Sequence, residues 1–124
     1  MNTPFALPFP PSSNNLFVNG KRGRFRSPRY EAWIAEVGVE IMRQRPAKYT
    51  GPVNLIYEFQ EGFDNRKRDL GNLEKATTDI LVLHRIIEAD DGSIVRRISL
   101  AWNPTIEGVR VLIEPLFGRQ EIAA

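Results

Sequence analysis

Residues 28–45 place apolar side chains at the spacing of one helix face, and Pro46 ends the pattern. Ser27 followed by Pro28 is typical of a helix start, because the serine oxygen accepts from an early amide and proline tolerates the first helical position. The apolar positions are Tyr30, Trp33, Ile34, Val37 and Ile41. We interpret this stripe as core rather than as an aromatic binding surface.

A second stretch, residues 70–83, has the same helical period. Its packing positions are Leu73, Ala76, Thr77, Ile80 and Leu83. Three other stretches predict strands. Residues 53–60 alternate apolar and polar side chains, which is the pattern of a strand with one buried face. We also expect strands over 94–102 and 108–114, joined as a hairpin by the turn residues 103–105.

The N-terminal segment, residues 5–11, alternates apolar residues but carries three prolines. Because proline lacks an amide donor, this segment suits a short edge strand. The order of elements predicts an α+β fold, a small mixed β-sheet with two main helices packed on one face. We expect one domain over residues 1–124, with a frayed tail at 118–124.

Composition places the chain in the ordinary globular class, with 42% hydrophobic and 26% charged residues and no cysteine. The absence of cysteine excludes disulfides, thiolate zinc sites and a thiol nucleophile. No apolar run approaches the roughly 20 residues that span a bilayer, and no leader pattern opens the chain. We therefore expect a cytoplasmic protein with no membrane partner.

Charge is divided unevenly along the chain. The net charge is +2, but residues 1–50 hold eight Lys/Arg against three Glu, while residues 51–124 hold nine Lys/Arg against twelve Asp/Glu. A basic surface beside an acidic cluster is what a metal-dependent enzyme acting on nucleic acid needs. A random partition of solvated charges is the alternative.

Two basic runs are candidates for phosphate contacts. The first lies in a Gly- and Arg-rich stretch that looks like an exposed loop or hairpin tip, with Asn19-Gly20 as the turn; it contains Lys21, Arg22, Arg24, Arg26 and Arg29. The second is Arg66, Lys67 and Arg68, directly before the helix at 70–83. A helix N-terminus carries partial positive charge, so this corner is expected to attract phosphate.

Asp69 lies inside the second basic run, and its simplest interpretation is the N-cap of the following helix. However, Asn72, Lys75 and Asp79 share one stripe of that helix, with Asp69 one turn earlier. These polar side chains would face either a groove or solvent, and the pattern fits both arrangements.

Asp90-Asp91-Gly92 is a turn motif. It also supplies two carboxylates that are separated from Asp69 by one helix in the sequence, and the return of the chain after that helix could bring the two segments together. Magnesium prefers one or two carboxylates completed by water and phosphate oxygens. Glu58 is a weaker candidate ligand, and we interpret His84 as incidental.

In these motifs the chain resembles the RusA-type Holliday junction resolvases. The resemblance rests on Leu7-Pro8-Phe9-Pro10-Pro11-Ser12-Ser13-Asn14, on Arg68-Asp69-Leu70-Gly71-Asn72-Leu73-Glu74-Lys75, on Asp79, and on Asp90-Asp91 before a strand. It implies a homodimeric, Mg²⁺-dependent endonuclease, with Mn²⁺ as a possible substitute, that nicks two symmetric strands of four-way junction DNA.

Carried over by motif, Asp69 and Asp91 are metal-binding and catalytic residues, Asp90 is a neighbouring ligand, Lys75 is the catalytic lysine and Asn72 is a supporting residue. The departure is Gly71, where the resemblance leads us to expect a second metal-binding aspartate. Three explanations compete. Asp90, Glu74 or Glu58 replaces the ligand, or a single weakly held ion suffices, or the protein binds branched DNA with little cleavage. A further alternative, outside the nucleases, is an interaction domain whose basic loop meets an acidic partner.

Overall fold

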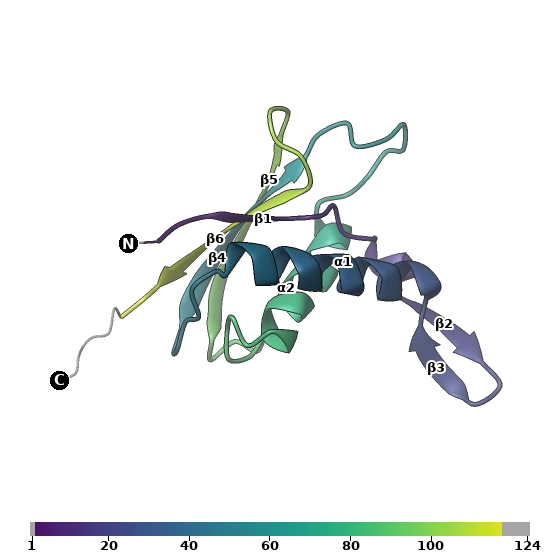
Figure 1. Cartoon of the computed structure of the whole chain (residues 1–124), viewed down its shortest axis with the longest axis horizontal. Coiled ribbons are helices and arrows are strands. Elements are labelled where there is room, and N and C mark those ends of the chain that lie inside the picture. Colours follow the sequence, from purple (N-terminus) through teal and green to yellow (C-terminus); the bar gives the residue numbers. More distant parts are fainter. Residues whose placement is uncertain (1, 118–124) are drawn as a thin grey trace.

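The structure, a computed structural model, describes residues 2–117. Within these residues a four-stranded sheet has the order β1-β6-β4-β5. The strands are β1 (Phe5–Leu7), β4 (Val53–Gln60), β5 (Val95–Asn103) and β6 (Val109–Pro115). The short β1 lies at one edge, as the prolines predict, and the long β4 lies inside the sheet (Figure 1). The predicted frayed tail at 118–124 falls outside the described residues.

Two helices, α1 (Pro28–Gln44) and α2 (Gly71–Leu83), cover one face of this sheet (Figure 1). In β4 every second residue is fully buried beneath them, as the alternation predicts: Val53, Leu55, Tyr57 and Phe59. The helices contribute Tyr30, Trp33, Val37, Leu73, Ala76, Thr77 and Ile80 to the same core. The α+β architecture and both helices are therefore confirmed, but Leu83 is exposed and is not part of the packing face.

The predicted hairpin between the last two strands is wrong. β4 pairs with β5 in parallel and with β6 antiparallel, so β5 and β6 flank β4 and do not pair with each other. Parallel neighbours need a long crossover, and the segment between β4 and β5, which contains α2, provides it. The sequence between the last two strands crosses the end of β4 instead of reversing tightly. It reaches β6 through Gly108, where φ is +70° and a Cβ would lie 2.2 Å from the carbonyl oxygen of Leu7.

Strands β2 (Phe17–Gly20) and β3 (Gly23–Arg26) form a separate antiparallel hairpin that projects from the body of the molecule (Figure 1). This confirms the hairpin alternative for the first basic run. The turn is different from the one predicted: Gly20 pairs with Gly23, so Lys21 and Arg22 form the turn and Asn19-Gly20 ends the strand.

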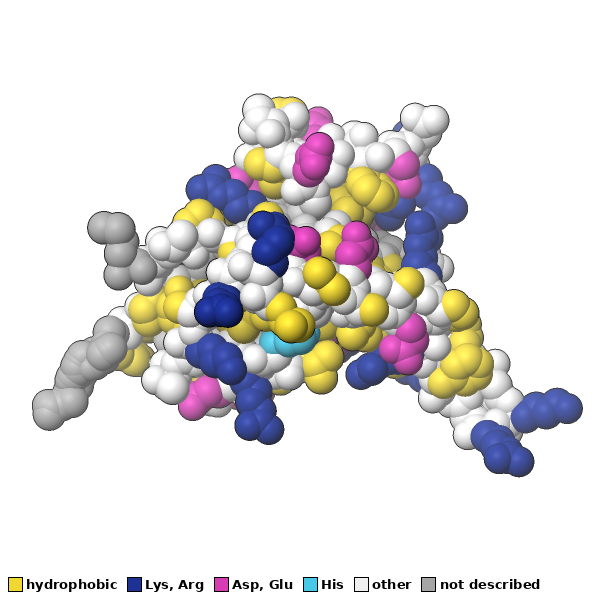
Figure 2. Space-filling view, in the orientation of Figure 1, with side chains coloured by type: hydrophobic (Ala, Val, Ile, Leu, Met, Phe, Trp, Pro, Cys, Tyr) yellow, Lys and Arg dark blue, Asp and Glu magenta, His cyan; other side chains and the backbone are white. Residues whose placement is uncertain are grey.

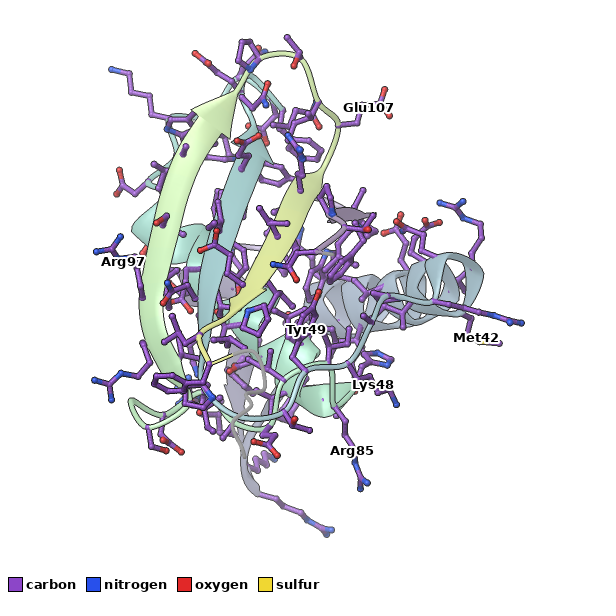
Figure 3. The ribbon with its side chains drawn as sticks, turned by 90° about the vertical axis from the view of Figure 1, so that its left-hand side faces the viewer. Met42, Lys48, Tyr49, Arg85, Arg97 and Glu107 are labelled. Carbon is purple, nitrogen blue, oxygen red and sulfur yellow. The ribbon has the colours of Figure 1, made fainter. Side chains whose placement is uncertain are left out.

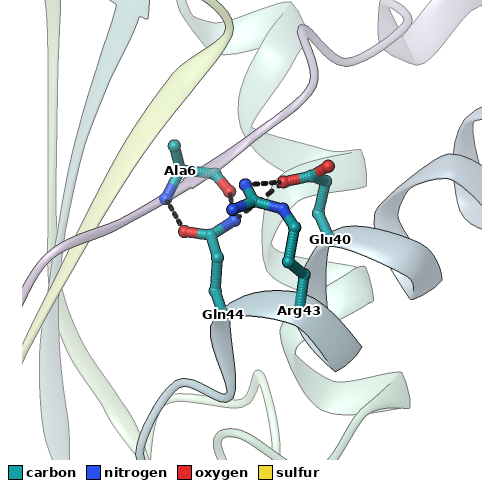
Figure 4. A network of polar contacts seen from close by, with 4 residues as sticks. All are labelled: Ala6, Glu40, Arg43 and Gln44. Carbon is teal, nitrogen blue, oxygen red and sulfur yellow. Dashed lines mark hydrogen bonds and ion pairs between the residues drawn. The ribbon is translucent and has the colours of Figure 1, made fainter.

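The outer edge of β1 is closed by a side chain of α1 (Figure 4). The amide of Gln44 accepts from the backbone N–H of Ala6 at 3.1 Å and donates to the carbonyl of Ala6 at 2.6 Å. Glu40 accepts from the same amide at 3.1 Å and is paired with Arg43. Gln44 thus replaces a neighbouring strand, and it fixes the N-terminal segment against the end of α1.

The face of the sheet away from the helices carries a mixture of polar and apolar side chains, among them Asn54, Ile56 and Glu58 of β4. Figure 3 shows Arg97 projecting from the edge strand β5 and Met42 projecting from α1 near its C-terminal end. None of the helices among residues 2–117 is long and apolar enough to cross a membrane.

Candidate active site and nucleic-acid interface

The loop that leads from β4 to α2 is held by an internal ion pair between Arg68 and Asp64. The guanidinium donates to both carboxylate oxygens, at 3.1 Å from Nε and 2.5 Å from a terminal nitrogen. Only 12% of the Arg68 side chain is exposed. The hydrogen bonds from Arg68 lower the pKa of Asp64 to about 2, so the pair is ionised at every physiological pH.

The same guanidinium lies against two stacked aromatic rings. Phe9, from the segment after β1, and Phe63, from the loop, are stacked with centroids 4.2 Å apart. The Cζ of Arg68 is 5.3 Å from the centroid of Phe9 and 5.7 Å from that of Phe63, within cation–π range. Arg68 therefore links the N-terminal segment to the loop, and most of its side chain is buried in these contacts.

Asp69 follows directly and is exposed. The helix cap is Leu70, which makes no side-chain cap bond, and Asp69 contributes only its backbone carbonyl, accepting from the amide of Asn72 at 3.0 Å. The prediction that Asp69 is merely an N-cap is therefore wrong. Asp69 lines a surface pocket of about 140 Å³ together with Arg66, Lys67, Arg68 and Asn72.

Asn72 is oriented by a neighbour from the other end of the chain. Ser13, in the short 3₁₀ turn η1 (Ser13–Asn15), donates to the amide oxygen of Asn72 at 3.2 Å. This bond joins the proline turn near the N-terminus to the first turn of α2. The two motifs, far apart in the sequence, therefore meet beside Asp69.

One turn further along α2, Lys75 forms an ion pair with Asp79 at 3.0 Å. The hydrogen bond to Asp79, together with the charges of Asp79, Asp90 and Glu74, raises the pKa of Lys75. The ammonium is thus cationic at neutral pH. The polar stripe predicted on α2 exists, with its lysine and aspartate paired to each other.

Asp90 and Asp91 lie in the turn before β5 and differ in what their carboxylates do. Asp91 accepts from the amide of Ser93 at 2.8 Å and from its hydroxyl at 2.5 Å, and these bonds lower the pKa of Asp91. The carbonyl of Asp91 also accepts from the amides of Ile94 and Val95. Asp91 is therefore the residue that builds the turn, while the negative charge of Asp90 acts on Lys75 of α2.

Across residues 2–117 no three His, Asp or Glu side chains gather as a group that could hold a metal ion. The oxygen donors near the pocket suit Mg²⁺ in kind, since Asp69 supplies a carboxylate and Mg²⁺ is completed by water and phosphate oxygens when few protein ligands are present. The donor set fits a sparsely held ion rather than a caged one.

Comparison with protein families decides which kind of protein this is. The family model described as "Endodeoxyribonuclease RusA" matches residues 8–114, nearly the whole chain. The chain belongs to the RusA endodeoxyribonuclease family. A search among curated proteins finds no match. The match spans the proline turn, the loop, α2 and the Asp90-Asp91 turn, and so includes every segment of the candidate site.

Glu58 and Glu74, the two glutamates that could replace an aspartate at Gly71 in this RusA-family chain, lie in different surroundings. Glu58 lies on the sheet face away from α2, where its carboxylate accepts from Asn103 at 2.8 Å and pairs with Arg110 at 3.5 Å. It cannot reach the pocket beside Asp69. Glu74, in the first turn of α2, accepts from Thr78 at 2.5 Å, and Thr78 is hydrogen-bonded to the buried hydroxyl of Tyr57 at 2.8 Å.

Gly71 itself lies in the first turn of α2 and is exposed. A Cβ built there meets no atom within 4 Å, and its φ is not in the left-handed region. Neither space nor backbone conformation requires glycine at this position. A Cβ fits there without displacing any described residue.

Four of the remaining predicted phosphate contacts of this RusA-family protein lie on the β2–β3 hairpin, and the fifth, Arg29, lies in the first turn of α1. Lys21 and Arg22 form its exposed turn, and Figure 2 shows cationic side chains at the tip of the projecting hairpin. Arg24 lies 4.4 Å over the ring of Phe17, and Arg26 lies between the ring of Tyr30 at 5.9 Å and the carboxylate of Glu31 at 3.7 Å.

Sequence reasoning missed the residues that hold the loop in place, namely Asp64, Phe9 and Phe63. The one available signal was the spacing of Asp64 and Arg68, four residues apart in a charged segment. No periodic pattern covers this loop, so only that spacing distinguishes Arg68 from its neighbours Arg66 and Lys67.

Proposed function

We propose that this RusA-family endodeoxyribonuclease is a Mg²⁺-dependent, structure-specific enzyme that resolves Holliday junctions by paired phosphodiester hydrolysis in recombination and repair. The observation that carries the proposal is the uncommitted carboxylate of Asp69, exposed in a pocket with Arg66 and Lys67 inside the matched region. A carboxylate between cations is suited to a metal-bound phosphate, because the cations hold the phosphodiester while the carboxylate holds the ion.

Asp69 is the first proposed metal ligand, and the turn before β5 supplies the second. Both Asp90 and Asp91 are candidates from the sequence. Asp90 is the stronger candidate, because Ser93 already uses Oδ1 of Asp91 and leaves only its Oδ2, whereas the charge of Asp90 reaches Lys75. When bound, Mg²⁺, or Mn²⁺ in its place, polarises a phosphate oxygen and lowers the pKa of a bound water.

Lys75 is proposed to stabilise negative charge that develops on the phosphate or on the leaving oxygen. Its raised pKa keeps it protonated, which suits electrostatic stabilisation and excludes service as a neutral base near pH 7. Asp79, paired with Lys75 at 3.0 Å, orients the ammonium. Asn72 positions the helix start through its bond with Ser13.

A Holliday junction has two equivalent strands, and we propose that a homodimer presents the same site to each. A two-fold symmetric dimer places two identical sites at symmetric positions, which matches the symmetry of a four-way junction. Paired nicks thus need no second type of subunit. The partner is four-way junction DNA in the cytoplasm of a bacterium or of a phage host.

A second candidate function is branched-DNA binding with weak or no cleavage. Two observations favour it: Gly71 has no carboxylate, and residues 2–117 contain no group of three metal-binding side chains. Fewer carboxylates hold a divalent ion less firmly.

The deciding experiment incubates the purified chain with a synthetic four-way junction and Mg²⁺, Mn²⁺ or EDTA, with the equivalent linear duplex as control. We expect symmetric nicks in the junction alone, with either metal and not with EDTA. Tight junction binding without nicks under both metals would establish the second candidate instead. The variants Asp90→Asn and Asp91→Asn compare the two candidates for the second metal ligand. They are a matched pair, because asparagine can keep the turn and each variant removes one charge.

A further inference from the structure

Phe25 is a phenylalanine that the core does not use. It lies in β3 opposite Val18 of β2, on the hairpin that projects from the body of the protein (Figure 1). Its side chain is 54% exposed. Every residue of β3 is exposed, so Phe25 does not contribute to the hydrophobic core.

The ring of Phe25 lies across the backbone of the neighbouring strand. A Cβ added at Gly20 would lie 2.6 Å from Cε1 of Phe25, a distance that real Cβ atoms do not show. Glycine therefore leaves the space that the ring occupies. The ring is supported from the Gly20 side and remains open to solvent elsewhere, which is the arrangement of a small flat platform.

Positive charge flanks this platform. Lys21 and Arg22 occupy the exposed turn next to Gly20, while Arg24 and Arg26 project from the opposite face of β3. Figure 2 shows the cationic side chains at the end of the hairpin. Negative charge together with flat apolar rings would complement this surface.

We propose that Phe25 stacks on an unpaired or unstacked base of DNA, with the hairpin cations holding the adjacent phosphates. Aromatic side chains within basic surfaces bind single-stranded nucleic acid in this way, because every base has a π-face. The proposal rests on the proposed function, since a four-way junction offers bases that can unstack at its branch point. It extends that function by assigning the hairpin a contact to bases as well as to phosphates.

The test compares Phe25→Leu, which keeps an apolar side chain and removes the ring, with Phe25→Trp, which keeps a ring. Phe117→Leu is the matched control, because Phe117 is also exposed, at 65%, and lies outside the hairpin. Fluorescence anisotropy measures affinity for a four-way junction, for single-stranded DNA and for a linear duplex. We expect Phe25→Leu to weaken binding of the first two about ten-fold, with little change for the duplex.

A second measurement places 2-aminopurine at the branch point and, separately, within one arm. We expect the unmodified protein and Phe25→Trp to change the branch-point fluorescence on binding, and Phe25→Leu to lose this change. Gly20→Ala should behave as Phe25→Leu does, because its methyl group displaces the ring.

The outcomes separate this inference from the proposed function. If the unmodified protein cleaves junctions while Phe25→Leu matches it in affinity and fluorescence, only the stacking role is overturned. Equal loss of affinity for all three DNAs also overturns it, because the ring then only shapes the hairpin. If the unmodified protein binds none of the DNAs, both the stacking role and the proposed function are overturned.

Discussion

The two basic segments of this protein look alike in the sequence and differ in the structure. On the β2–β3 hairpin, Lys21 and Arg22 are exposed at the turn of a projecting arm. In the loop before α2, Arg68 is 12% exposed, paired with Asp64 and packed on Phe9 and Phe63. The number of cations in the sequence therefore overstates how many the loop exposes. For the hairpin turn, both cations are exposed.

The difference assigns the two segments separate tasks. The hairpin is joined to the body through Leu16 and Ser27 and projects away from it (Figure 1), so we expect its turn cations Lys21 and Arg22 to act through binding. The loop carries Asp69 and is fixed at its arginine, so changes there alter the position of a candidate metal ligand. Substitutions in the loop should therefore affect chemistry, and substitutions in the hairpin should affect affinity.

The largest expected effect is that of Asp69→Asn. This change keeps the shape of the side chain and removes the charge that would hold the ion, and Asp69 makes no described side-chain bond that the fold needs. We expect cleavage of a four-way junction to fall by more than about 100-fold, since loss of even an indirect metal contact costs 10- to 100-fold. Junction affinity, measured by anisotropy in Ca²⁺, should change little. Equal cleavage by the variant would remove Asp69 from the site.

Gly71→Asp tests whether the loop site is short of a carboxylate. The position is open, and an acidic residue in the first turn of α2 is favourable to the helix. We expect the Mg²⁺ concentration for half-maximal cleavage to fall about ten-fold, because one more charged ligand holds the ion. Gly71→Asn is the control, since it adds similar bulk without charge. No shift in either variant would indicate that another carboxylate already serves.

Much of the fold follows from local patterns. The alternation in β4, the Ser27-Pro28 helix start and the proline-limited β1 all match the structure, because each is set by neighbouring residues. Strand partners are not set locally. The turn residues at 103–105 suggested a hairpin, but β4, buried on one face and paired at both edges, lies between the two strands.

The candidate site was predictable only in part. The sequence indicated Asp69 and Lys75, and the family match includes both. The sequence did not indicate that Arg68 is paired with Asp64, or that the carboxylate of Asp91 accepts from Ser93 of the same turn. Both contacts depend on the rotamers of single side chains. Identical residue types side by side, such as Asp90 and Asp91, are distinguished by geometry alone.

Arg68→Lys should have an intermediate effect. Lysine cannot make the two-pronged contact with Asp64 or lie flat against Phe9, so the loop that carries Asp69 should loosen. We expect cleavage to fall about ten-fold with little loss of junction affinity. Arg66→Lys, an exposed neighbour on the same loop, should retain most of the activity. A large loss of affinity in Arg68→Lys without loss of turnover would show that Arg68 contacts DNA after all.

The same pair gives a pH signature. The pKa of Asp64 is lowered to about 2, so the stability it contributes is present above the ordinary pKa near 3.8 and is lost as pH falls toward 2. In Arg68→Lys the pKa of Asp64 should move back toward its ordinary value, and acid unfolding should begin at higher pH. A carboxyl NMR titration measures the pKa of Asp64, and circular dichroism measures the pH at which unfolding begins. An unchanged Asp64 titration would mean that the ion pair does not hold the loop in solution.

The smallest change in activity is expected from the double variant Lys21→Ala and Arg22→Ala at the hairpin turn. Each phosphate contact that is lost should lower the slope of log affinity against log salt by about 0.9, so the double variant should lose nearly two units. Turnover at saturating protein should stay the same, because neither residue lies near Asp69. Arg97→Ala, which removes an exposed cation from β5 (Figure 3), is the control and should leave the slope unchanged. If Arg68→Lys lowered the slope while the hairpin variant did not, the tasks of the two basic segments would have to be exchanged.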